Sequence, residues 1–151
     1  MIKILKIIAI IALVALIGIQ FIPTNSNQSD IVPVTDFITT YNPPKEVVAI
    51  LRTSCYDCHS NNTAYPWYNK IQPVAMFLED HIAHGKEEFS FSGFGEYSDR
   101  RKKSKLKSLI RQVEQDEMPL DSYTLIHRDA KISDSEKELV LNWVNKVLDS
   151  I

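Results

Sequence analysis

Two cysteines and a histidine stand close together in the first half of the chain. Cys55 and Cys58 are three positions apart, and His59 follows the second cysteine directly. Two thiols at this spacing can each add to one vinyl group of a haem, and the adjacent imidazole then reaches the iron as its proximal ligand. The pattern uses both cysteines of the chain. It predicts one covalently attached haem c per chain, with His59 on the metal.

Other chemistries are open to the same residues. A thioredoxin-like dithiol needs the two cysteines beside a βαβ pattern, which the sequence lacks. A structural zinc site needs four nitrogen or sulfur ligands, so another histidine would have to complete the set. A plain disulfide between Cys55 and Cys58 is the third alternative in an oxidising compartment. Haem attachment is favoured because it also accounts for His59 and agrees with export of the domain.

A sixth ligand for the iron has several candidates. Met118 is followed by Pro119 after a predicted helix, and its soft thioether favours ferrous iron, so it is the expected distal ligand. His81 and His84 are the rivals, because they lie three positions apart on another predicted helix and can lean toward one side. Met76 is expected to pack within that helix instead.

The N-terminus predicts a membrane anchor. Lys3 and Lys6 precede a run from Ile7 to Ile22 in which only Gln20 is polar. No small-residue cleavage site follows this run, so an uncleaved transmembrane helix is favoured over a signal peptide. The two lysines predict that the N-terminus is cytoplasmic. We therefore expect a single-pass protein of the inner (cytoplasmic) membrane, with its domain facing the periplasm or an equivalent extracytoplasmic side.

Behind the anchor, the sequence predicts an all-α domain. Residues 1–22 form the predicted anchor, residues 23–41 a polar, proline-interrupted linker that holds the domain off the bilayer, and residues 42–151 the domain. Four helices are expected, and no alternating run is long enough for a strand. The first starts at an Asn42 cap and ends at Ser54, the second runs from Pro73 to Gly85, the third follows a Ser98 cap and ends before Met118, and the fourth follows a capping box from Ser133 to Glu136.

Aromatic and charged residues suggest surroundings for the haem. Eight aromatic residues between positions 65 and 97 are candidates for its apolar wall: Tyr65, Trp67, Tyr68, Phe77, Phe89, Phe91, Phe94 and Tyr97. Six cations between positions 100 and 107 are interpreted as a solvated helix face, with a docking surface for an acidic redox partner or for anionic lipid headgroups as the alternative. With 17 Lys and Arg against 19 Asp and Glu, the chain as a whole is not expected to bind nucleic acid.

The run from Ser54 to Asn62, continued by Tyr65-Pro66-Trp67-Tyr68, resembles the bacterial haem-binding domain family. This is a cytochrome c-like group of small proteins that usually carry an N-terminal membrane anchor. Asp116-Glu117-Met118-Pro119 and Ser122-Tyr123-Thr124 also match family positions, although glycine often stands where this chain has Asp116. The resemblance covers about residues 42–148. It implies a cytochrome c-like fold, haem on Cys55 and Cys58, His59 as proximal ligand and a distal Met118.

These observations predict a membrane-anchored monohaem c-type cytochrome that transfers single electrons to unidentified redox partner proteins. The alternative is a haem-based ligand or redox sensor with a displaceable sixth ligand. Catalysis is not expected, since no acid–base pair beside an open iron site is evident for a small peroxidase.

Overall fold

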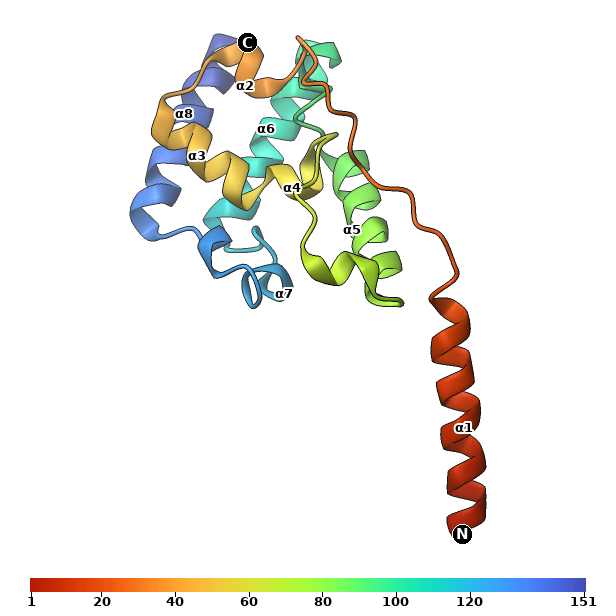
Figure 1. Cartoon of the computed structure of the whole chain (residues 1–151). Helices are drawn as coiled ribbons and strands as arrows, with labels where there is room; N and C mark the ends of the chain where they lie inside the picture. Colours follow the sequence, from red (N-terminus) through yellow and green to blue (C-terminus); the bar gives the residue numbers. More distant parts are fainter.

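The computed structural model describes residues 1–151 and contains only helices, turns and one isolated bridge between Gln28 and Asn62. Figure 1 shows a long N-terminal helix that stands apart from a cluster of shorter helices. The prediction of an all-α domain behind a single N-terminal helix is confirmed.

Helix α1 (Ile2–Ile19) has no buried side chain. It has 18 residues, so it extends about 27 Å, close to the roughly 30 Å hydrocarbon core of a bilayer. Its length and composition are sufficient to cross a membrane. The helix ends three residues before Ile22, the predicted end of the anchor, and the Gln20 side chain turns back to donate to Leu16 O at 2.9 Å.

The domain begins earlier than the sequence predicts. Asp36 caps helix α2 (Phe37–Tyr41), and the Phe37 ring is fully buried in the core, although this segment was assigned to the linker. Asn42 does not start the next helix: with φ of 44°, it ends α2 in the left-handed conformation that asparagine tolerates. Helix α3 (Lys45–Ser54) starts after Pro44 instead.

Part of the segment predicted to be the linker lies against the domain. Asn27 donates to Ser60 O at 2.8 Å, and its own carbonyl oxygen accepts from Thr63 N at 2.9 Å. The Asn62 side-chain oxygen accepts from the backbone of Ser29 and Asp30, both at 2.9 Å. The polar composition that suggested a free tether therefore serves specific hydrogen bonds.

Three helices enclose most of the core. Helix α8 (Asp134–Ser150) packs against α3 and α6 (Asp99–Glu114). The caps predicted for α6 and α8 are confirmed, because the Ser98 hydroxyl accepts from Arg101 N and a complete capping box joins Ser133 to Glu136. Eleven apolar side chains form the core: Phe37, Val47, Ile50, Leu51, Phe89, Phe91, Phe94, Leu106, Val140, Val144 and Val147.

Helix α5 (Val74–Glu88) differs from its prediction in length and in its buried face. It continues past Gly85, where we expected it to stop, because this glycine allows close packing on the neighbouring short helix α4 (Tyr56–His59). A methyl group at Gly85 would lie 3.0 Å from Cys58 O. The helix buries Ala75 and Ile82, whereas Met76, expected to pack, is 46% exposed.

Four short elements complete the chain. They are η1 (Trp67–Lys70) before α5, η2 (Phe94–Glu96) before α6, and α7 (Asp121–Thr124) followed by η3 (Arg128–Ala130) before α8. Figure 1 shows α7 and the start of α5 at the same end of the domain, the end nearest to α1. These elements position the segments that surround the cysteine pair.

Candidate functional site

The cysteine pair and His59 occupy a single helical turn. Cys55 ends α3 and, with φ of −130°, breaks the helix before α4 begins. Its carbonyl oxygen accepts from Cys58 N at 3.3 Å and from His59 N at 3.1 Å. Both thiols and the imidazole are thereby held around one turn, and all three side chains line the same cavity of about 300 Å³. This volume lies at the lower end of the range for small-molecule sites.

The other walls of the cavity come from helices distant in sequence. α5 contributes His81, His84 and Glu88, and α6 contributes a row from Lys105 to Val113. The segment after α6 adds the remaining wall, namely Met118, Pro119, Leu120 and Tyr123. All four predicted site residues, Cys55, Cys58, His59 and Met118, therefore line one cavity. The two histidines proposed as rival ligands line it as well, so the choice of distal ligand stays a prediction.

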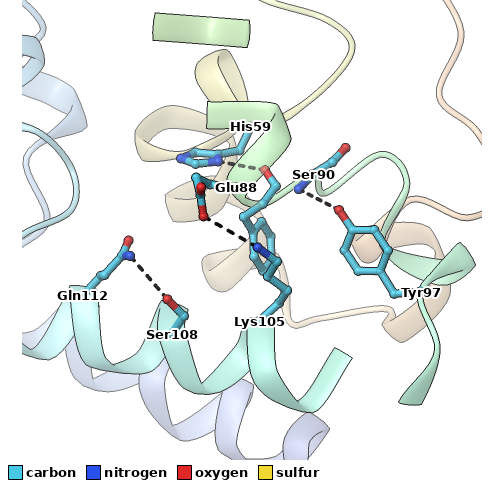
Figure 2. Close-up of polar contacts among 8 residues, drawn as sticks. His59, Glu88, Ser90, Tyr97, Lys105, Ser108 and Gln112 are labelled. Atoms are coloured by element: carbon cyan, nitrogen blue, oxygen red, sulfur yellow. Dashed lines mark hydrogen bonds and ion pairs between the residues drawn. The ribbon is translucent and has the colours of Figure 1, made fainter. Parts of the chain in front are cut away.

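The His59 ring is held by a backbone carbonyl. Its Nδ1 donates to Phe89 O at 2.8 Å, as the dashed line from the labelled histidine in Figure 2 shows. The Phe89 and Phe91 rings lie edge-on to the imidazole, with centroids 6.1 and 6.3 Å away. Because Nδ1 carries the proton of this bond, Nε2 keeps its lone pair. A carbonyl on one ring nitrogen and a metal on the other is the usual arrangement of a metal-binding histidine.

The two thiols are poor nucleophiles in this environment. Burial raises the pKa of Cys55 to about 12 and that of Cys58 to about 11, with Asp57 adding to the effect on Cys58. Reactive dithiols depend on the opposite shift, toward a stable thiolate. The direction of these pKa shifts is opposite to that of a thioredoxin-like dithiol. No group of three His, Cys, Asp or Glu side chains is arranged to hold a metal ion.

A hydrogen bond joins the segment after Met118 to the cysteine motif. The Tyr123 hydroxyl donates to Asp57 Oδ2 at 2.7 Å, and Asp57 Oδ1 accepts from Ala64 N at 3.1 Å. Burial, and then the adjacent carboxylate, raise the pKa of the Tyr123 phenol. Sequence reasoning placed Tyr123 among the family matches but gave it no role. No local signal reveals the contact, because its partners are 66 positions apart.

A second contact supports the same segment from outside. The Tyr123 ring stacks on His127, with centroids 4.4 Å apart, and His127 Nε2 lies 2.6 Å from the Tyr68 hydroxyl. Tyr68 was expected to form part of the apolar wall, but it acts here as a hydrogen-bonding group. Of the eight aromatic candidates for that wall, Phe89 and Phe91 line the cavity, whereas Phe94 lies in the core and Trp67 and Phe77 are exposed.

Polar side chains of α5 and α6 mark the edge of the cavity. In Figure 2, His59 and Glu88 lie on one side, and Ser108 and Gln112 of α6 lie on the other. Lys105 Nζ is 3.7 Å from Glu88 Oε2 and is the only Lys or Arg side chain lining the cavity. One member of the cationic run at 100–107 thus belongs to the site.

The donor set fits a covalently held haem. Two thiols can form thioethers, an oriented imidazole can bind iron, and a thioether at Met118 or an imidazole at His81 or His84 can supply the sixth ligand. The phenylalanine rings beside His59 provide an apolar wall.

Comparison with protein families gives a match to the haem-binding domain over residues 14–146. The match covers most of the chain, including the cysteine motif and Met118. No curated protein and no solved structure shows a significant match. The chain belongs to the haem-binding domain family, as the resemblance of its motifs predicted.

Proposed function

We propose that this member of the haem-binding domain family is a membrane-anchored monohaem c-type cytochrome that carries single electrons. Cys55 and Cys58 would hold one haem through thioether bonds, and His59 and Met118 would bind its iron. The observation that carries the proposal is that one cavity is lined by both thiols, by Met118 and by an imidazole whose Nδ1 is already engaged. Bound haem supplies a one-electron couple.

The residues around the cavity support this role in distinct ways. The Phe89 carbonyl orients the His59 ring and increases the basicity of its Nε2. Phe89 and Phe91 keep water from the proximal side, which lowers the local dielectric constant. Met118 offers a soft sulfur that favours the reduced metal. Lys105 places a cation at the edge, suited to a haem propionate.

The anchor sets the compartment in this proposal. Helix α1 would cross the cytoplasmic membrane, with Lys3 and Lys6 retained on the cytoplasmic side. The domain would then face the extracytoplasmic side, where haem is attached to exported chains. There it would exchange electrons with redox partner proteins through the exposed edge of the cofactor.

The test is the intact mass and spectrum of the full chain, produced with haem-maturation machinery and purified in detergent. We expect a mass increased by one haem and a low-spin spectrum in both oxidation states. Met118→Ala should abolish the low-spin spectrum, whereas Met76→Ala, which removes an exposed thioether outside the cavity, should leave it unchanged. His81→Ala and His84→Ala should also leave it unchanged.

Three outcomes would contradict the proposal. A mass equal to that of the polypeptide would exclude covalent haem. If His81→Ala or His84→Ala loses the low-spin spectrum and Met118→Ala keeps it, that histidine, and not Met118, is the distal ligand. A high-spin spectrum in the unmodified chain that responds to carbon monoxide would favour a haem-based sensor over an electron carrier.

A further inference from the structure

The exposed apolar side chains of the domain are not scattered evenly. From residue 37 onward, nine large hydrophobic side chains are exposed, and eight of them fall in two segments, residues 67–77 and 120–126. Trp67 is 76% exposed and Leu125 is 77% exposed. The eight, which we call the apolar face, are Trp67, Ile71, Val74, Met76, Phe77, Leu120, Leu125 and Ile126. Exposed apolar side chains that gather in this way often mark an interaction site.

The two segments lie at one end of the domain. The hydrogen bond between the Tyr68 hydroxyl and His127 Nε2, 2.6 Å long, ties the first segment to the end of the second. Figure 1 shows that this end, with α7 and the start of α5, is the one nearest to α1. The ninth exposed residue, Leu139, belongs to α8, which packs on α3 and α6 instead.

The end of α1 is hydrogen-bonded to Gln72, which lies within the first of these two segments. Gln20 Nε2 donates to Gln72 O at 3.1 Å, and Gln72 N donates to Gln20 Oε1 at 3.0 Å. Gln72 Nε2 also donates to Ile22 O at 3.0 Å, and the Gln72 side chain is only 6% exposed. If α1 spans the bilayer, Gln20 lies where the hydrocarbon ends. Gln72 and its apolar neighbours Ile71 and Val74 are then at the membrane surface.

The charge of the face suits a lipid surface. Residues 67–77 contain one lysine, Lys70, and no acidic residue, although the chain has 19 Asp and Glu. The second segment contains a single acid, Asp121. An exposed tryptophan such as Trp67 is typical of the boundary between headgroups and acyl chains. Hydrogen bonds from Asn27 to Ser60 and Thr63 keep the connecting segment against the domain.

We propose that the apolar face is a second membrane contact, which lies in the interfacial region of the bilayer that α1 crosses. This inference rests on the membrane anchor of the proposed function, not on the identity of the iron ligands. Leu120 belongs both to the face and to the wall of the cavity that contains Met118. The domain therefore rests on the bilayer with the Met118 side of its cavity close to the lipid.

The test uses the two tryptophans of the chain, Trp67 and Trp143, as internal probes. Full-length protein labelled with fluorotryptophan is placed in lipid nanodiscs in its oxidised form and observed by fluorine NMR, so that no reductant reaches the nitroxide; broadening by ferric haem is the same with labelled and unlabelled lipids. Trp67→Phe assigns the resonances. Lipids carrying a nitroxide near the top of the acyl chain should broaden the Trp67 resonance several-fold relative to unlabelled nanodiscs. Trp143, which packs against Phe37 in the core, should change little.

A pair of matched variants tests whether the whole face is in contact. Leu125→Asp places a charge in the second segment and should lift the domain, so that the nitroxide broadening of Trp67 falls. Leu139→Asp, which alters the exposed leucine on α8, should leave the nitroxide broadening of Trp67 unchanged. Equal broadening of the two tryptophans, or protection of Trp67 from both the lipid nitroxide and a water-soluble relaxation agent, would overturn the proposal. The second result would indicate a protein partner, such as another copy of the chain.

Haem content, measured on the same samples, separates this inference from the proposed function. A chain that lacks covalent haem but shows selective broadening of Trp67 would refute the cytochrome and support the membrane contact. A haem-loaded chain in which Trp67 is broadened by the water-soluble agent alone would support the cytochrome and refute the membrane contact.

Discussion

Removing the Tyr123 hydroxyl should weaken both the domain and the attachment of Met118. In Tyr123→Phe, Asp57 Oδ2 loses its 2.7 Å donor. A hydrogen bond to a carboxylate contributes about 1.5–3 kcal/mol, and both side chains are half-buried, so water can partly replace the phenol. We expect a loss of about 1.5 kcal/mol, which for a domain of this size lowers Tm by roughly 6 °C.

The functional consequence follows from where Tyr123 sits. It joins the segment that contains Met118 to the turn that contains the cysteines, so its loss should make Met118, the proposed distal ligand, easier to displace. If the full 1.5 kcal/mol acts on that segment, added imidazole should bind the oxidised protein about tenfold more tightly in Tyr123→Phe. The assay is a spectrophotometric imidazole titration of the full, haem-loaded chain, together with thermal unfolding.

The control is Tyr41→Phe. The Tyr41 hydroxyl has no hydrogen-bond partner within the chain, and the Tyr41 ring packs against Phe37 and Phe94. This variant should change neither Tm nor imidazole affinity appreciably. A double-mutant cycle with Asp57→Asn isolates the pair and should give a coupling of about 1 kcal/mol. Reduced stability with unchanged imidazole affinity would refute the idea that Tyr123 holds the Met118 segment.

Two further changes test the packing and the capping of helices. Gly85→Ala should lower thermal stability and haem content, because its methyl group would lie 3.0 Å from Cys58 O. Gly93→Ala should be tolerated, because no atom lies closer than 3.8 Å to the added methyl group. Equal effects of the two substitutions would contradict the packing argument. Ser133→Ala should cost about 1 kcal/mol at neutral pH. The hydrogen bonds from Ser133 lower the pKa of Glu136 below 4.5, so their contribution is present above that pH and lost as the pH falls through the lowered value. Denaturant titrations should therefore show a smaller gap between Ser133→Ala and the unmodified chain in acid, and a constant gap would refute the assignment.

Local signals in the sequence were sufficient for the features that depend on neighbouring residues. The spacing of Cys55, Cys58 and His59 was sufficient to predict that they share one turn, since a helical turn brings such residues together wherever it lies. The caps at Ser98 and Ser133 placed α6 and α8, because a capping side chain bonds to its own helix. The unbroken apolar run before Gln20 was likewise sufficient to predict the N-terminal helix without tertiary information.

Contacts between distant segments were outside the reach of such signals. Phe37 reads as part of a polar linker, yet it is buried because the Phe91 and Phe94 rings meet it in space. The glycine at position 85 predicts a helix end. In the structure it lies within α5, where the absence of a side chain lets the backbone of Cys58 pack closely. Phe77 is a candidate for the apolar wall by its residue type, yet in the structure its ring packs on His81 and is 61% exposed.

The sequence by itself predicted haem binding, the helical class and the N-terminal apolar helix, because each follows from residue type and spacing within a few turns of chain. Only the tertiary structure decided that Met118, His81 and His84 share one cavity with the cysteines, that Tyr123 bonds to Asp57, and that the end of α1 meets an apolar face. These features join residues about 20 to 65 positions apart. Their formation depends on the packing of the whole core, and no local pattern encodes that.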